Sequence, residues 1–207
     1  MSKFSRVIWL TGYSGSGKSS VAKGLCKSLT AAGCQAHILD GDKTRAGLCS
    51  DLTFSVADRR ENVRRIGEVS KLFMDAGVIC IVALISPYRK DREMVRQLFQ
   101  EGQFIEVFIN APLSVCESRD VKGLYAKARS GVIENFTGIS SSYEPPLNPE
   151  IVLHTDRQTV QESVQVVLDF LEIDVLVNME CSPKVDPGVM RVCGAEAPLT
   201  SNETKET

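Results

Sequence analysis

The stretch Gly12-Tyr13-Ser14-Gly15-Ser16-Gly17-Lys18-Ser19 decides the fold of this chain. It matches the phosphate-binding pattern G-x-x-x-x-G-K-[ST] at every specified position. Glycines let successive backbone N–H groups turn toward a phosphate at the positive end of the following helix. The lysine of such a loop contacts the β- and γ-phosphates of a nucleotide, and the last serine binds Mg²⁺. We expect ATP to be bound by Gly12, Ser14, Gly15, Ser16, Gly17, Lys18, Ser19 and Ser20.

The residues on both sides of this loop have the periodicity that the motif requires. Residues 7–10 form a short apolar run, which is typical of a buried parallel strand. Val21, Leu25 and Leu29 recur at a spacing of four and predict one face of a helix, which Gly33 ends. This context disfavours the alternative of a glycine-rich turn with an unrelated lysine. The glycine spacing also differs from the dinucleotide-binding pattern G-x-G-x-x-G.

Strand and helix patterns alternate along the rest of the chain. Four more apolar runs predict strands at residues 36–39, 78–85, 104–109 and 151–153. Apolar stripes at helical spacing predict helices at residues 55–76, 89–100 and 160–171. Five β-α units in series predict an α/β fold of the P-loop NTPase type. In that fold a parallel sheet carries helices on both faces, as a three-layer sandwich.

Two segments interrupt this rhythm. Residues 120–149 are polar and contain glycines, and they are too long for an ordinary connection, so we predict an active-site lid. From residue 175 the chain loses its periodicity. We therefore expect residues 1–174 to form one kinase domain and residues 175–207 to form a largely disordered tail.

The overall composition sets limits on partners and location. The chain has 207 residues and a formal net charge of −2, so it has no general attraction for nucleic acid. It has no uninterrupted apolar run of the ~18 to 20 residues that a membrane span needs. The seven cysteines are scattered without a C-x-x-C pair, which argues against a zinc site and a disulfide framework. Four of them lie in or beside apolar runs, and we predict that they are small core residues: Cys26, Cys34, Cys80 and Cys116. We expect a cytoplasmic protein in a reducing compartment.

An acidic pair follows the predicted strand at residues 36–39. Asp40 and Asp42 lie at its carboxyl end, where ligands of parallel sheets bind and where the phosphate loop also lies. Carboxylates at this place suit two roles, which are binding Mg²⁺ and drawing a proton from an attacking hydroxyl. The alternative is an Asp-rich turn without a chemical role.

The next informative residues surround the start of the helix at residues 55–76. Arg59 and Asn62 are three residues apart and share a helix face, so both are candidates to face one cleft. For Arg60 and Arg64 we favour a solvated face. Phe54 suits stacking on a base, with core packing as the alternative.

These residues are followed by three further motifs, Ile85-Ser86-Pro87-Tyr88-Arg89, Arg119-Asp120-Val121-Lys122-Gly123-Leu124-Tyr125 and Phe136-Thr137-Gly138-Ile139. In combination they resemble the adenylylsulfate kinase family over residues 7–171. The resemblance implies transfer of the γ-phosphate of ATP to the 3′-hydroxyl of adenosine 5′-phosphosulfate (APS). The products are 3′-phosphoadenosine 5′-phosphosulfate and ADP. The resemblance also implies Mg²⁺ as cofactor and a homodimer as assembly.

The same resemblance implies roles for single residues on the catalytic and donor side. Asp40 is the general base or hydroxyl-orienting group and a second candidate ligand of Mg²⁺ beside Ser19. Lys18 and Asp42 complete the catalytic set, with Asp42 beside the acceptor or the metal. Arg119 lies near the ATP base.

The resemblance also implies an acceptor site. Its residues are Asp42, Arg45, Phe54, Arg59, Asn62, Ile85, Ser86, Lys122, Asn135 and Phe136. Two arginines hold the phosphosulfate, the 85–86 backbone helps to place the nucleoside, and two phenylalanine rings sandwich the adenine. Stacking of this kind is worth ~1 to 3 kcal/mol per base.

The chain departs from the family pattern at five positions. Lys43 stands where the family usually has Asn, Ala46 where His or Gln is common, and Cys49 where Asn is usual. Glu134-Asn135 replaces the usual Lys-Gly. Two alternatives therefore stay open: a related P-loop kinase that acts on another nucleotide with an anionic tail, and a non-catalytic nucleotide-binding module.

Overall fold

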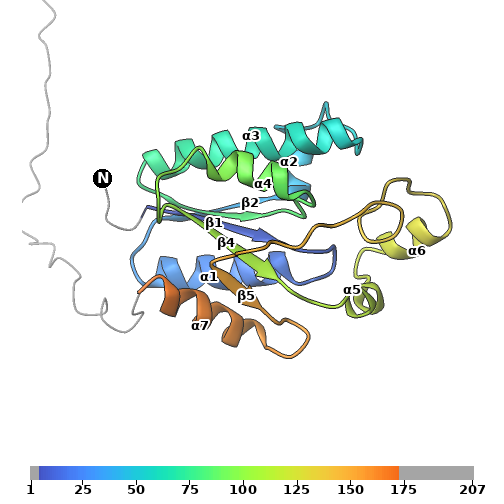
Figure 1. The fold of residues 1–207 in the computed structure, drawn as a ribbon. Helices are drawn as coiled ribbons and strands as arrows, with labels where there is room; N and C mark the ends of the chain where they lie inside the picture. Colours follow the sequence, from blue (N-terminus) through green and yellow to red (C-terminus); the bar gives the residue numbers. More distant parts are fainter. Residues whose placement is uncertain (1–4, 173–207) are drawn as a thin grey trace, which may run out of the picture.

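A computed structural model describes residues 5–172, and the predicted tail at residues 175–207 lies outside them. Five parallel strands form one sheet in the order β2-β3-β1-β4-β5 (Figure 1). The strands are β1 Val7–Thr11, β2 Ala36–Asp40, β3 Ile79–Ala83, β4 Phe104–Ile109 and β5 Ile151–Leu153. All five predicted strands are present, and the P-loop NTPase-type α/β fold is confirmed.

Helices cover both faces of this sheet. Helices α1 (Lys18–Ala31) and α7 (Val160–Phe170) pack on one face, and α3 (Val56–Asp75) and α4 (Arg89–Arg96) pack on the other (Figure 1). Strand β1 is buried at every position because its alternate side chains enter the two different cores. Ile8 packs against the α1 side, whereas Trp9 packs against the α3 side. This arrangement explains why the strands read as continuous apolar runs.

The predicted helix boundaries are largely confirmed. Ser55 caps α3, and its hydroxyl accepts a hydrogen bond of 3.1 Å from the backbone N–H of Asp58. Gly33 and Gly77 follow the ends of α1 and α3 with positive φ angles, which glycine adopts without strain. The prediction for residues 89–100 is wrong at its end, since α4 stops at Arg96 and turns lead into β4.

Three short helices were not predicted from periodicity, and all lie beyond the carboxyl ends of the strands. They are α2 (Gly41–Ala46), α5 (Leu113–Arg119) and α6 (Leu124–Arg129). Helices α5 and α6 project from the body on the side to which the strand arrows point (Figure 1). Each has fewer than eight residues, too few to show a clear apolar repeat.

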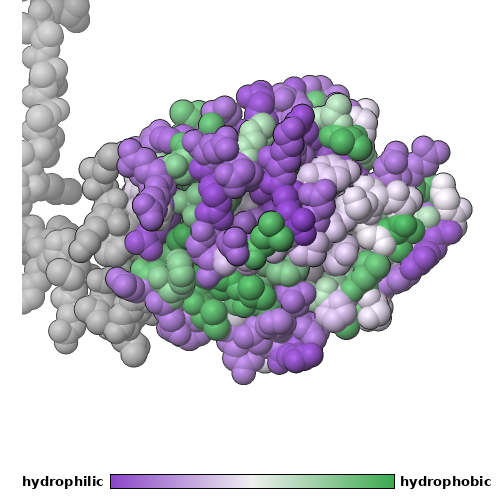
Figure 2. Space-filling view, in the orientation of Figure 1, coloured by the Kyte–Doolittle hydropathy of each residue, from purple (hydrophilic) through white to green (hydrophobic). Residues whose placement is uncertain are grey.

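The surface of the described residues differs between the two sides of the sheet. Figure 2 shows polar side chains over α3 and α4, whereas apolar side chains gather lower, toward β5 and α7. These two elements contribute exposed Val152, Val166 and Phe170. Within residues 5–172, none of the helices combines the length and apolar character that a bilayer span requires.

The cysteines that we predicted in the core differ in burial. Cys80 and Cys116 are buried, as expected. Cys26 and Cys34 are only partly buried and pack against the rim of the core formed with α1. Cys49, for which we predicted no core position, is buried as well.

Candidate active site

The phosphate loop has a backbone that only glycine allows at two points. Gly12 and Gly15 have φ angles of +149° and +74°. A Cβ atom at Gly12 would lie 2.6 Å from the carbonyl oxygen of Ile109, and one at Gly15 would lie 2.8 Å from that of Cys116. The loop therefore fits between β4 and α5 only without side chains at these positions.

Lys18 is held over this loop by carbonyl groups of the loop itself. Its Nζ atom donates hydrogen bonds to the carbonyl oxygens of Gly12 (2.9 Å) and Tyr13 (2.5 Å). The side chain is buried, and this burial lowers the pKa of the ammonium group to about 8. A buried cation with a lowered pKa beside a glycine-rich loop is suited to the negative charge of a phosphate.

Ser19 and Asp40 bring the phosphate loop and the end of β2 together. The Ser19 hydroxyl donates a hydrogen bond of 2.8 Å to Oδ2 of Asp40. The other carboxylate oxygen accepts a bond of 3.1 Å from the backbone N–H of Asp42 and caps α2. The predicted metal ligand and the predicted base are thus direct neighbours. The alternative of a turn is partly right as well, because Asp40 also caps a helix.

Two basic residues that follow β4 reach back to the donor side. Lys122 forms an ion pair with Asp42 in which both side chains are more than half exposed. Arg119 donates hydrogen bonds to the carbonyl oxygens of Thr155 (2.6 Å) and Gly15 (3.4 Å). Both side chains therefore lie beside the phosphate loop or the acidic pair, and their roles stay predictions.

The predicted acceptor side contains two arginines around one exposed ring. The guanidinium carbon of Arg45 lies 4.3 Å from the ring centroid of Phe54, and that of Arg59 lies 5.6 Å from it. Phe54 is 56% exposed, which decides against core packing for this ring. Burial is the main cause that lowers the pKa of both arginines, so an anion here meets partly desolvated positive charge.

Arg59 also joins α3 to the predicted lid. It donates hydrogen bonds to the Asn135 carbonyl oxygen (2.6 Å) and to the Thr137 hydroxyl (3.1 Å). Asn62 on the same helix face is buried and donates to the sulfur of Cys49 at 3.3 Å. Both residues point inward, as their spacing predicts.

The outer face of α3 is solvated as we expected. The side chains of Arg60 and Arg64 are about half exposed, and they pair with Asp91 and Glu61.

Asn135 and Phe136 occupy different environments. Asn135 has a φ angle of +54°, a conformation that glycine and asparagine tolerate better than other residues. Phe136 is only 7% exposed and packs edge-on against Tyr125, with ring centroids 5.0 Å apart. Since Phe54 is open and Phe136 is covered, the structure does not bring both rings to an open surface. The adenine sandwich stays a prediction.

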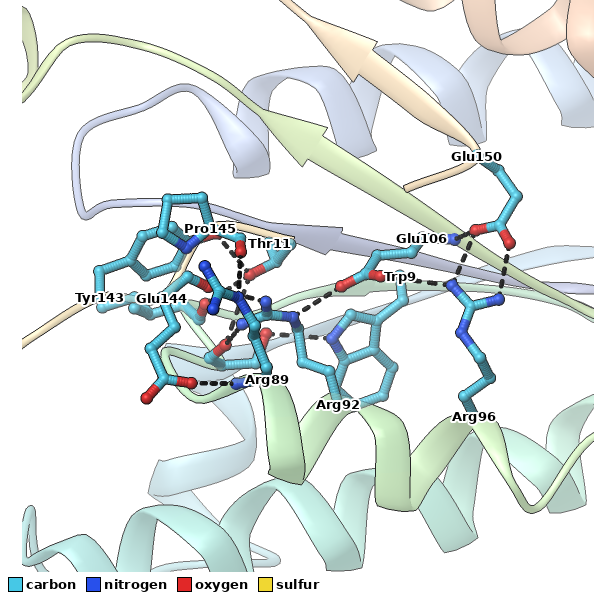
Figure 3. Close-up of polar contacts among 12 residues, drawn as sticks. Trp9, Thr11, Arg89, Arg92, Arg96, Glu106, Tyr143, Glu144, Pro145 and Glu150 are labelled. Carbon is cyan, nitrogen blue, oxygen red and sulfur yellow. Dashed lines mark hydrogen bonds and ion pairs between the residues drawn. The ribbon is translucent and has the colours of Figure 1, made fainter. Parts of the chain in front are cut away.

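The 85–86 backbone is held from several sides (Figure 3). The Thr11 hydroxyl donates to the Ile85 carbonyl oxygen (2.7 Å), and the Trp9 indole donates to the Ser86 hydroxyl (3.1 Å). Arg92 donates to the Ser86 carbonyl oxygen (2.7 Å). Sequence reasoning missed Trp9, Thr11 and Arg92, because an apolar strand and a charged helix carry no local signal of such contacts.

The predicted lid consists of two parts with different contacts. Its first part, residues 124–139, packs around Tyr125 and Phe136 in a small apolar cluster that it shares with Tyr13 of the phosphate loop and Cys116 of α5. Its second part, residues 141–149, is tied to the sheet, and we call it the strap. The Tyr143 hydroxyl lies 3.0 Å from that of Thr11, and the Glu144 N–H donates to the Pro87 carbonyl oxygen at 2.8 Å.

Comparison with known proteins gives consistent results. The family described as adenylylsulphate kinase matches residues 4–154. An adenylyl-sulfate kinase of Geotalea daltonii is 59% identical over 172 residues, which cover 83% of this chain and 85% of the relative. One of Vibrio parahaemolyticus is 57% identical over 166 residues, with coverages of 80% and 81%.

A solved structure is similar as well. The APS kinase CysC of Mycobacterium tuberculosis, in complex with AMPPNP and APS, has a TM-score of 0.78 and 47% identity. The alignment covers 81% of this chain and 97% of that one.

Proposed function

The chain belongs to the adenylylsulphate kinase family, and on this premise we propose how its residues transfer the γ-phosphoryl group of ATP to the 3′-hydroxyl of APS. The observation that carries the proposal is the 2.8 Å hydrogen bond between Ser19 and Asp40. It joins the phosphate loop to the strand end from which the acceptor residues follow. Donor phosphate and acceptor hydroxyl therefore have a common meeting point.

On the donor side, the phosphate loop wraps the β-phosphate with backbone N–H groups. Lys18 exchanges its contacts with the Gly12 and Tyr13 carbonyl oxygens for contacts with the β- and γ-phosphates. Arg119 borders the ATP base, which is supported by its contacts with Gly15 of the phosphate loop and with Thr155 after β5.

Mg²⁺ fits the residues beside the phosphate loop. The Ser19 hydroxyl and the Asp40 carboxylate offer the hard oxygen ligands that this ion prefers. In the described part of the chain, His, Cys, Asp and Glu side chains form no group of three or more that suits a metal. Phosphate oxygens and water would supply the remaining ligands, as is usual for this ion. When bound, Mg²⁺ neutralises charge that develops on the transferred phosphoryl group.

On the acceptor side, Asp40 accepts the proton of the 3′-hydroxyl of APS while the 3′-oxygen bonds to the γ-phosphorus. The bond between the γ-phosphorus and the β-γ bridging oxygen breaks, and ADP leaves. Arg45 and Arg59 bind the phosphosulfate, and their placement around Phe54 supports this assignment. Asn62 and the 85–86 backbone place the nucleoside. Phe54 and Phe136 stack on the adenine, and Asp42, Lys122 and Asn135 line the site.

The direct test is coupled ADP release with ATP and Mg²⁺, with and without APS. The proposal requires release that depends on APS and on its 3′-hydroxyl. An analogue without that hydroxyl is the matched control, and it must give no release. Faster release with another nucleotide bearing an anionic tail would support the related-kinase alternative. No release with any acceptor would support the non-catalytic alternative.

We also propose that residues 1–174 are sufficient for catalysis and that the chain forms a homodimer. Helix α7 is the last helix of the described residues and packs on the sheet. It ends at Phe170, before residue 174, which supports the first part. Family resemblance supports the second part. Activity and light scattering of a chain truncated after residue 174 test both parts, and an inactive but folded fragment would contradict the first.

A further inference from the structure

Helix α4 carries two arginines one turn apart whose surroundings differ. The side chain of Arg92 is 3% exposed, and that of Arg96 is 29% exposed. Both pair with Glu106 of β4, at 2.6 Å and 3.3 Å. Arg96 also pairs with Glu150 at 2.6 Å (Figure 3). The two arginines share one carboxylate but contact different parts of the chain.

Arg92 directs its donors to three separate segments. Nε donates to Glu106 (2.6 Å), Nη1 to the Ser86 carbonyl oxygen (2.7 Å) and Nη2 to the Glu144 carbonyl oxygen (2.8 Å) (Figure 3). These belong to β4, to the loop after β3 and to the strap. The fixed fork of a guanidinium group can reach three such acceptors at once, whereas an ammonium group is a single point.

The loop that Arg92 holds has an unusual backbone. Ser86 has a φ angle of +38°, which is uncommon for a residue other than glycine. Such a conformation persists only where the surroundings determine it. Here Arg92 fixes the Ser86 carbonyl group, Trp9 fixes its hydroxyl, and Thr11 fixes the carbonyl group of Ile85.

The strap is fixed to the same place. Tyr143 contacts Thr11, and the Glu144 N–H donates to the Pro87 carbonyl oxygen. The Glu144 carboxylate accepts from the Arg89 N–H at 2.8 Å. Arg92 therefore lies between the 85–87 loop and the strap and holds both through carbonyl groups.

A buried ion pair contributes little stability compared with well-packed apolar residues. The Arg92–Glu106 pair is nearly inaccessible, and the remaining contacts of this guanidinium group go to backbone next to the acceptor site. This pattern favours a role in geometry over a role in stability alone.

We propose that Arg92 is a positioning residue for the acceptor, because its hydrogen bonds to the carbonyl groups of Ser86 and Glu144 hold the 85–86 backbone where the nucleoside binds. This inference rests on the proposed function, in which that backbone places the nucleoside. It concerns a side chain that is only 3% exposed and therefore acts through the backbone groups that it holds.

The test compares Arg92→Lys with the matched control Arg96→Lys. Both changes keep the charge on α4 beside Glu106, but only the first removes hydrogen bonds to the Ser86 and Glu144 carbonyl oxygens, whereas Arg96 pairs with Glu150 next to β5. For Arg92→Lys we expect the KM for APS to rise about tenfold or more, as expected for lost hydrogen bonds to a charged group, while the KM for ATP changes less than about threefold. For Arg96→Lys we expect a lower melting temperature and no difference between the two KM changes.

A second variant keeps the inference testable if Arg92→Lys fails to fold. Arg92→Gln combined with Glu106→Gln leaves no unpaired charge in the interior, and the same selective rise in the APS KM is expected. Equal changes of both KM values, or a selective rise in Arg96→Lys, overturn the inference. If the unmodified enzyme releases no ADP with APS, the proposed function fails instead, so the two failures are distinct.

Discussion

The two halves of the active site are built in opposite ways. The phosphate loop consists of eight consecutive residues, and its shape comes from glycine backbone and from a lysine that contacts its own loop. The acceptor half is assembled from segments far apart in the sequence. Side chains of β1 and α4 and the backbone of the strap together fix the 85–87 loop.

This difference predicts where each half is sensitive. A change in the phosphate loop acts directly on bound phosphate, because the loop itself supplies the phosphate contacts, although Tyr125 and Thr155 also donate hydrogen bonds to the Ser14 and Ser16 carbonyl oxygens (2.9 and 2.6 Å). A change in the acceptor half acts through other residues and can lie far from the substrate. Variants on each side should therefore separate the effects on ATP from the effects on APS.

The largest effect is expected for Lys18→Ala. Loss of the Lys18 ammonium group should lower turnover by about 10³-fold or more, since it removes charge stabilisation in the transition state. The fold should remain, because the lysine contacts carbonyl groups of the loop and not the apolar core. Steady-state ADP release and thermal melting measure the two outcomes. Clear activity in a folded variant would refute the assignment.

Asp40→Asn should lower turnover by about 10²-fold while ATP still binds, as expected for a general base or positioning group. Asp42→Asn is the matched control, because its carboxylate is exposed and pairs only with Lys122 among the ion pairs described. A smaller loss is expected there. If ATP binding collapses together with turnover in Asp40→Asn, then Asp40 is chiefly a ligand of the metal or nucleotide.

The same difference explains how much could be predicted from the sequence. The strands, the long helices and the phosphate loop follow from local patterns, since motif and periodicity lie within a few residues. Helix α6 and the strap contacts could not be found in this way. The left-handed conformation of Ser86 and the role of Arg92 depend on residues more than 50 positions apart, such as Glu144. A charged helix such as α4 reads as solvated although Arg92 is buried.

The two parts of the predicted lid should differ in their protection from hydrogen exchange. We expect residues 124–139 to gain protection from hydrogen exchange when nucleotide and acceptor bind, because their cluster is small and ligand contacts add stabilisation. The strap should be protected already without ligand, since Tyr143 and Glu144 tie it to the sheet. Exchange measured by mass spectrometry distinguishes the two parts. Equal gains over 120–149 would support a single lid, and no gain would exclude ligand-dependent closure.

Alanine substitutions at two glycines with nearly equal φ angles distinguish the tight fit of the phosphate loop from the general cost of a positive φ angle. Gly15 and Gly33 have φ angles of +74° and +78°, so alanine at either position costs about 1 to 2 kcal/mol of stability. Only at Gly15 does a Cβ atom meet a neighbour, the Cys116 carbonyl oxygen at 2.8 Å, whereas Gly33 has open space. Gly15→Ala should also raise the KM for ATP, by roughly tenfold. Equal KM values in the two variants would contradict the tight fit of the loop.

The smallest expected effect is a pH dependence that belongs to the donor half alone. Burial lowers the pKa of Lys18 from 10.5 to about 8 in the free enzyme. The unfolded chain then binds more protons than the folded chain between about pH 8 and 10.5, so this group makes the folded state more stable as pH rises through that window.

Bound phosphate favours the charged form of Lys18 and raises its pKa again. Binding of ADP with Mg²⁺ should therefore take up about half a proton per chain at pH 8 and weaken about twofold from pH 7 to pH 8. APS binding should lack this dependence, because Arg45 and Arg59 stay charged. Calorimetry in buffers of different ionisation enthalpy measures the uptake, and Lys18→Arg, whose charge is permanent, is the control. Equal proton uptake in both proteins would place the titrating group elsewhere.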